Sequence, residues 1–227
     1  MAVYEYKGTV NSSGVNQGTN YKPSPATGSQ ATPPGGTTHT ETFDFIGAAT
    51  QSLAIPAGAT NIQFTVKGAG GGGGQADDVG NQSSGLPGHL VATSHPTSGI
   101  TLTIYVGQGG QINSEVNGGA GGWGYTSGQF GSNGEEGDGY AFGSSGGGGS
   151  SAIKLGATLL AEAAGGNGGR SSDWDIYSAG EGGTGGGSDY PATTLADGGG
   201  AGGAAGSPPY DPGIPGSPGQ VVITYDY

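Results

Sequence analysis

Clusters of glycine constrain the fold of this chain more than any other feature of its sequence. Glycine supplies 56 of the 227 residues, whereas its usual share is about 7%. An ordered glycine loses more backbone entropy than any other residue and destabilises a regular element by about 0.5–1 kcal/mol relative to alanine. Glycine clusters inside an ordered domain therefore require a backbone geometry that side chains would block.

The apolar content is low, which leaves backbone hydrogen bonds as the main source of order. Hydrophobic residues make up 31% of the chain, too few for a large conventional core. Disorder is the competing interpretation, because a Gly/Ser-rich chain with a net charge of −12 can be a flexible linker. Strand-like segments between the glycine clusters, and a charged fraction of only 10%, favour an ordered domain.

Two extended geometries suit glycine clusters, and the sequence separates them. Collagen is excluded, because no Gly-X-Y period is sustained and only 13 prolines occur. The alternative is a left-handed threefold helix, which rises about 3.1 Å per residue and makes no internal hydrogen bonds. Without Cβ atoms such helices approach closely and bond sideways through N–H···O and Cα–H···O contacts. The clusters that predict a bundle of these polyglycine helices are 68–74, 107–110, 118–124, 146–149, 165–169, 182–187 and 198–206.

Between the glycine clusters lie short segments with the alternation typical of β-strands. The clearest is 61–67, in which Ile62, Phe64 and Val66 share one face. The predicted strands are 42–45, 51–55, 61–67, 89–93, 100–106, 152–155, 158–161 and 220–225. Since no segment shows helical periodicity, the chain is predicted to be all-β with almost no α-helix.

The first part of the chain differs from the rest. From about residue 8 to residue 40 the chain is rich in Ser, Thr, Gly, Pro and Asn, which predicts an extended, partly polyproline-like arm. The beginning of the chain alternates Val3 with Tyr4 and Tyr6 and reads as a short edge strand. We therefore expect an attachment arm over 1–40 and a glycine-rich domain over 41–227.

The charge balance and the hydropathy exclude several classes of partner. Five basic residues against 17 acidic ones are incompatible with nucleic-acid binding, which needs clustered Lys and Arg. An anionic membrane surface is disfavoured for the same reason, and no apolar run approaches the roughly 18 residues of a membrane span. The absence of cysteine excludes disulfides and thiol chemistry. The N-terminus lacks the pattern of a signal peptide.

No motif for catalysis or cofactor binding is present. The glycine clusters lack the lysine of a phosphate-binding loop, and His39, His89 and His95 form no triad pattern. We therefore expect no enzyme and no cofactor. Acidic clusters could bind calcium or hydrolyse glycosides, or could serve only to keep a glycine-rich surface soluble. The weak calcium candidates are Glu135, Glu136, Asp138, Asp173 and Asp175.

Aromatic residues between the glycine clusters are the best candidates for recognition. Rigid aromatic side chains on Gly- and Ser-rich loops supply contact area at a low entropic cost. The alternative is a structural role, in which aromatic residues cap the ends of a bundle that has few side chains of its own. The candidates for receptor contact are Trp123, Tyr125, Phe130, Tyr140, Trp174, Tyr177 and Tyr190.

The order of these motifs resembles a known glycine-rich domain family. The matching motifs are Gly-Ala-Gly-Gly after a strand, Leu-Thr-Ile-Tyr-Val-Gly-Gln-Gly-Gly, four glycines before Ser-Ser-Ala-Ile-Lys-Leu-Gly, and Gly-Gln-Val-Val-Ile-Thr-Tyr. The family occurs in bacteriophage tail-fibre and other surface proteins, and the glycine-rich region of the anaplastic-lymphoma-kinase receptor family is similar. Over residues 41–227 the resemblance implies a TNF-like, jelly-roll-type β-sandwich with inserted polyglycine helices.

The resemblance leads to expectations about function. The first is a non-enzymatic protein of the virion surface, a tail-fibre tip or receptor-binding adhesin whose loops touch a host glycan or protein. The alternatives are a capsid decoration or head-fibre protein and a subunit of a non-viral extracellular filament or matrix. In the virion cases residues 1–40 would bind other virion structural proteins, and the protein would be a homo-oligomer or present in many copies.

Overall fold

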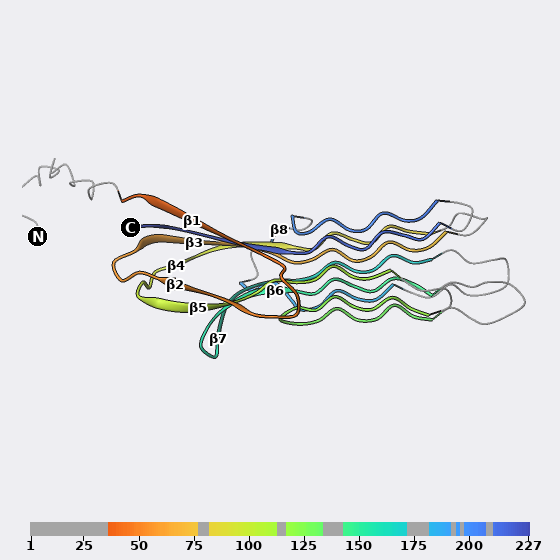
Figure 1. Ribbon diagram of the computed structural model, residues 1–227, viewed down its shortest axis with the longest axis horizontal. Helices are drawn as coiled ribbons and strands as arrows, with labels where there is room; N and C mark the ends of the chain where they lie inside the picture. The colour runs from red at the N-terminus through yellow and green to blue at the C-terminus, as the bar shows by residue number, and fades with distance from the viewer. Residues whose placement is uncertain are drawn as a thin grey trace, which may run out of the picture. The chain divides into compact units, whose positions relative to one another are not determined.

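Figure 1 shows the computed structural model of the chain, which describes residues 36–76, 82–112, 117–133, 143–171, 182–191, 194–195, 198–207 and 211–227. These residues form two antiparallel β-sheets that continue into long extended segments rich in glycine. Within these ranges no helix is present. The predicted all-β class is therefore confirmed.

The described residues form nine strands. They are β1 (Thr38–Asp44), β2 (Gln51–Ile55), β3 (Thr60–Lys67), β4 (Leu90–His95), β5 (Ile100–Tyr105), β6 (Ser151–Leu155), β7 (Thr158–Ala163), β8 (Thr194–Leu195) and β9 (Gln220–Asp226). The eight strands predicted within 41–227 are all present, most with shifted ends, and the short edge strand predicted at the start of the arm lies outside the described residues. Strand β8 has no counterpart among the predicted strands, because it is too short to leave a sequence pattern. Strand β1 begins at Thr38, inside the range assigned to the arm.

The two sheets enclose the apolar core. One has the strand order β1-β9-β3-β4-β8 and the other β2-β5-β6-β7. Alternate residues of β3 and β9 point inward, as the sequence of 61–67 predicts, and they pack against β5, β6 and β7. The buried side chains that form the centre of this core are Ile62, Phe64, Val66, Leu102, Ile104, Ile153, Val221 and Ile223. This small core anchors the ends of the glycine-rich segments.

Ten extended segments continue from the sheets or from the turns between them (Figure 1). We name them g1 (68–76), g2 (82–89), g3 (106–112), g4 (117–124), g5 (127–133), g6 (143–150), g7 (164–171), g8 (182–187), g9 (198–207) and g10 (211–219). Odd-numbered segments run away from the sheets and even-numbered segments return. The segments therefore form five antiparallel pairs.

The hydrogen bonds of g1 repeat every third residue. Gly68, Gly71 and Gly74 donate to carbonyls of g2 at N···O distances of 2.9–3.0 Å. The two intervening sets of amides donate to g6 and to g10, while g3, g7 and g9 donate to carbonyls of g1. A backbone whose successive amides donate in three different directions, with a repeat of three residues, is a threefold extended helix. Segment g1 thus has six neighbours and no bond within itself.

Segment g6 is a second centre of the same kind. It donates to g3, g5 and g7 and accepts from g1, g4 and g8. Successive neighbours around each centre also bond to each other, in the rings g2-g9-g10-g3-g6-g7 and g1-g3-g4-g5-g8-g7. The ten segments therefore form a hexagonal lattice of two fused rings. The predicted polyglycine bundle is confirmed, and its two centres contain the two longest uninterrupted glycine runs, 70–74 and 146–149.

Glycine is required in this lattice because neighbouring backbones fill the space of a Cβ atom. A Cβ added to Gly71 would lie 2.0 Å from the carbonyl oxygen of Asn167, and one on Gly73 would lie 2.0 Å from that of Ala204. Neither glycine has φ in the left-handed region, so conformational freedom is not the reason for their presence. Close approach of backbones excludes every other side chain there.

Prolines occupy the positions of the bundle where an amide would have no acceptor. In g10, amides donate to g9 from Ile214 and Ser217 and to g3 from Gly216 and Gly219. The remaining set of g10 residues, again one in every three, faces outward. It holds only prolines, which have no N–H that would need an acceptor. These prolines are Pro212, Pro215 and Pro218.

Candidate recognition surface

The five pairs of glycine segments all end on the side of the bundle away from the sheets (Figure 1). Their connections, which lie outside the described residues, are 77–81, 113–116, 134–142, 172–181 and 208–210. By sequence these connections carry nine of the 17 acidic residues and none of the five basic ones. The acidic residues are Asp77, Asp78, Glu115, Glu135, Glu136, Asp138, Asp173, Asp175 and Glu181. The bundle therefore holds side by side the segment ends that flank five connections, four of which carry acidic residues.

Most of the residues that the sequence singles out fall in these connections or in the arm. They lie outside the described residues. This group contains Tyr140, Trp174 and Tyr177, the calcium candidates Glu135, Glu136, Asp138, Asp173 and Asp175, and the arm residues Val3, Tyr4 and Tyr6. The structure describes the other four candidates for receptor contact.

Trp123 and Tyr125 lie at the base of the bundle, where g4 meets the sheets. The Trp123 ring stacks on Tyr105 with centroids 6.2 Å apart and tilts against Phe45 at 6.4 Å. The Tyr125 ring meets Tyr105 edge-on at 5.2 Å, and the ammonium group of Lys154 lies 5.3 Å from its centroid. Both rings are half-buried. This packing is the geometry of an aromatic cap that joins the sandwich to the bundle.

Phe130 and Tyr190 are more exposed. Phe130, on g5, is 72% exposed, and Tyr190 is 50% exposed. Tyr190 also exchanges two backbone hydrogen bonds with Glu162 of β7. Of the described candidates, these two offer the most ring surface to a partner.

Each histidine is engaged by a neighbour within the sandwich or at its junction with the bundle. His39 stacks on Tyr225, and His95 stacks on Phe64. The Nδ1 atom of His89 lies 2.7 Å from Oδ2 of Asp189, whose Oδ1 accepts from the amide of Ala164. None of these contacts places a histidine against a serine or threonine hydroxyl.

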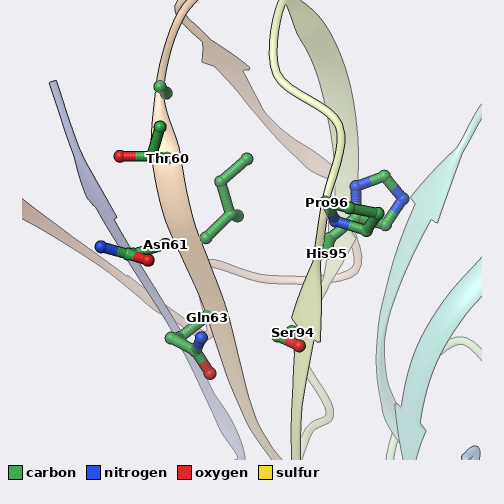
Figure 2. A pocket seen from close by; sticks show the side chains of 8 residues that line it. Thr60, Asn61, Gln63, Ser94, His95 and Pro96 are labelled. Atoms are coloured by element: carbon green, nitrogen blue, oxygen red, sulfur yellow. The ribbon is translucent and has the colours of Figure 1, made fainter. Parts of the chain in front are cut away.

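A shallow pocket of about 520 Å³ lies between the ends of β3 and β4. Figure 2 shows Asn61, Gln63, Ser94 and His95 around it, and apolar atoms come from Ile62 and Pro96. No carboxylate belongs to its lining. His95 therefore has no acidic partner there, and the pocket lacks the pair of groups that acid–base chemistry needs.

Several polar side chains that sequence reasoning missed cap the bundle. The Ser150 hydroxyl donates to Oε1 of Glu162 at 2.7 Å, and Glu162 is only 4% exposed. Outer amides of the lattice donate to side chains of the next segment, as Gly185 does to Asn167 and Trp123 to Gln108. These positions could not be found from the sequence, because they are defined by which segments become neighbours in space.

Among the described residues, no group of three or more His, Cys, Asp or Glu residues is arranged to hold a metal ion. Nor does this part of the chain contain a helix with the length and apolar character of a membrane span.

A family model described as a glycine-rich domain matches residues 46–226. Because this match covers most of the chain, the chain belongs to that glycine-rich domain family, and the resemblance seen in its motifs is confirmed to that extent. A search of curated proteins finds no match.

Proposed function

We propose that this member of the glycine-rich domain family is a non-enzymatic protein of a virion surface, a tail-fibre tip or receptor-binding adhesin. In this proposal the connections at the far end of the bundle touch a host glycan or protein, and residues 1–40 bind other virion proteins. The observation that carries the proposal is that five pairs of glycine segments end together on one side of a backbone-bonded lattice.

The lattice supplies the rigidity that a presented surface needs. Each of the central segments g1 and g6 is bonded to six surrounding segments, so the segment ends from which the connections start are held in fixed positions. Holding loop ends on a rigid scaffold reduces the entropy that is lost when the loops bind a partner. The same arrangement of variable loops on a rigid frame is how many proteins separate binding from folding.

The chemistry of the connections supports recognition rather than packing. By sequence, 172–181 contains Trp174 and Tyr177 beside Asp173 and Asp175, and 134–142 contains Tyr140 among three acidic residues. Aromatic rings stack on the apolar faces of sugars and of protein side chains, while carboxylates accept hydrogen bonds from hydroxyl and amino groups. A host glycan or a basic protein surface fits this combination. The virion location itself is supported only by the motif resemblance.

The test is binding of the labelled full chain to a panel of bacterial cell envelopes and to a glycan array. The variant Trp174→Ala/Tyr177→Ala is expected to weaken binding by about tenfold or more, since two aromatic contacts of a binding surface are removed. Its thermal unfolding should be unchanged. The matched control is Thr184→Ala, which alters an exposed side of g8 and should bind as the parent does.

Two results would contradict the proposal. One is binding that survives when both 134–142 and 172–181 are replaced by Gly/Ser segments of equal length. The other is binding that is lost in Thr184→Ala while the fold is retained. Labelled antibody on phage heads rather than tails would favour the capsid-decoration alternative instead.

A further inference from the structure

Strand β1 is an edge strand with one open side. Its only sheet neighbour among the described residues is β9, with Thr40 opposite Thr224 and His39 opposite Tyr225. Thr37 and Tyr227 exchange both backbone hydrogen bonds. In an antiparallel ladder the bonded pairs alternate, so residues 39 and 41 also bond to β9. The amides and carbonyls of Thr38, Thr40 and Thr42 therefore point away from the sheet.

At the opposite side of the sandwich both sheets have further pairing, whereas no described strand pairs with the outer side of β1. Strand β8 pairs with β4, and Tyr190 bridges to Glu162 on β7. At the far end of β1, the side chain of Gln51 donates to the carbonyl of Asp44 at 2.9 Å. The uncovered part of the edge is thus limited to residues 38–42. An open edge of this kind is a template for another strand.

The sequence of this open stretch is complementary to itself. It reads Thr-His-Thr-Glu-Thr. Threonines flank Thr40 symmetrically at positions 38 and 42, and His39 and Glu41 lie at equal distances on either side of it. If a second copy pairs antiparallel with Thr40 opposite Thr40, then Thr38 lies opposite Thr42 and His39 lies opposite Glu41, each twice. A hydrogen bond from the His39 imidazole to the Glu41 carboxylate and Thr–Thr pairs across the strands both stabilise a sheet. Any register that places Glu41 opposite Glu41 is disfavoured by repulsion.

The side chains are already placed for this pairing. Thr38, Thr40, Glu41 and Thr42 are exposed, so no rearrangement is needed to reach them. The His39 ring is held by stacking on Tyr225 at a centroid distance of 5.3 Å. The hydroxyl of Thr38 donates to Asp226 at 2.7 Å. The edge is therefore largely preorganised, which lowers the entropic cost of association.

From these observations we propose that the occupant of the β1 edge is a second copy of this chain, bound through residues 38–42 about a twofold axis at Thr40. The five-stranded sheets of two copies then form one continuous sheet. This pairing sets how copies associate through the sandwich and does not depend on what the far end of the bundle binds. A twofold contact of this kind closes on itself and gives a dimer rather than a filament.

The test is the mass of the full chain in solution, measured by sedimentation equilibrium over a concentration series. The parent is expected to be a dimer in equilibrium with a monomer. His39→Glu places Glu opposite Glu41 twice and should weaken the dimer by about tenfold or more, since like charges opposite each other destabilise a sheet. The double variant His39→Glu/Glu41→His restores a His–Glu pair at both positions, with the two residues exchanged, and should recover the dimer.

A second variant tests the backbone bonds. Thr40→Pro removes the central outward amide from each copy but no bond to β9, and proline is tolerated on edge strands. It should be a monomer that melts as the parent monomer does, whereas Thr40→Val should still dimerise. The proposal is overturned if the parent is monomeric at every concentration, if Thr40→Pro dimerises like the parent, or if the exchange of the two residues does not rescue His39→Glu.

Discussion

At the residue scale, glycine in this protein serves two different purposes. Gly47, Gly58, Gly99, Gly156 and Gly187 have positive φ and supply backbone conformations that other residues rarely adopt. Apart from Gly187 at the end of g8, the lattice glycines have ordinary φ values, and at nearly all of them a Cβ atom would overlap neighbouring backbone. Substitution therefore has different consequences in the two groups. At a turn it introduces local strain, whereas in the lattice it forces two segments apart.

Gly73→Ala tests the lattice requirement. The new Cβ would lie 2.0 Å from the carbonyl oxygen of Ala204 and 2.4 Å from its carbon, and only movement of g1 or g9 can relieve this. We expect a loss of about 3 kcal/mol in the free energy of unfolding, at the upper end of overpacking effects, measured by denaturant unfolding. Ala204→Ser, on the exposed side of g9, is the matched control and should change stability by less than about 0.5 kcal/mol. Equal stability of the two variants would refute the role of close approach.

Asp226 gives a prediction about pH. Hydrogen bonds from Asn61 and then Thr38 hold the pKa of this carboxyl below its ordinary value. Because the folded-state pKa is lowered, the stabilisation is present above the unfolded-state pKa and is lost as the pH falls through the folded-state value. Asp226→Asn should therefore be less stable than the parent at neutral pH, and the difference should shrink below about pH 3.9. Thermal unfolding across this range checks it, with Asp44→Asn as control. A difference that is constant with pH would contradict the assignment.

At the element scale, each glycine segment follows a rule of three registers. Residues that recur every third position of a segment form one register. In the outer segments the register that meets a centre is nearly all glycine, with Ser171 of g7 as an exception, and the others meet a neighbour or solvent. Segment g10 shows this as Gly213, Gly216 and Gly219 alternating with Ile214 or Ser217 and with proline. In the centres g1 and g6 all three registers meet neighbours, and only Gly, Ala and Ser occupy the fully enclosed positions.

The register rule predicts opposite effects at two adjacent residues of g10. Ile214→Pro removes the bond from this amide to the carbonyl of Ala204, which is 2.9 Å long, and leaves that acceptor without its donor. Pro215→Ala adds an outward amide that water can satisfy. We expect Ile214→Pro to lose about 1–3 kcal/mol and Pro215→Ala to change by less than about 1 kcal/mol. Denaturant unfolding measures both, and a larger loss in Pro215→Ala would show that the registers are misassigned.

The same rule explains how much of the fold the sequence predicts. Alternation places β3 and β9, and the density of glycine marks g1 and g6, because both patterns are local. The segment g10 is harder to predict, since only three of its nine residues are glycine and it continues the lattice through prolines. The neighbours of each segment, and therefore the capping roles of Asn167 and Glu162, depend on contacts between distant parts of the chain. The aromatic roles of Trp123 and Tyr125 are ambiguous for the same reason.

At the scale of the whole domain, the sandwich and the bundle share their central elements. Strand β3 leads directly into g1, g6 leads into β6, and g10 leads into β9. The most buried strands thus continue into or lie beside the most enclosed glycine segments. A break in the lattice near the sheets must then disturb the core, and the reverse also holds. Such continuity favours unfolding as one cooperative unit.

Amide hydrogen exchange tests this continuity. If the domain unfolds as one unit, the amides of g1 and g6 should exchange as slowly as those of β3 and β9, since all four open only with global unfolding. Outer amides that donate to side chains, such as that of Gly185 to Asn167, should exchange faster because a local rotation frees them. Addition of denaturant should accelerate g1, g6, β3 and β9 in parallel. If g1 and g6 exchanged much faster than β3 and β9, the bundle would be a separate and weaker unit. The apolar core would then be the only source of global stability, despite its small size.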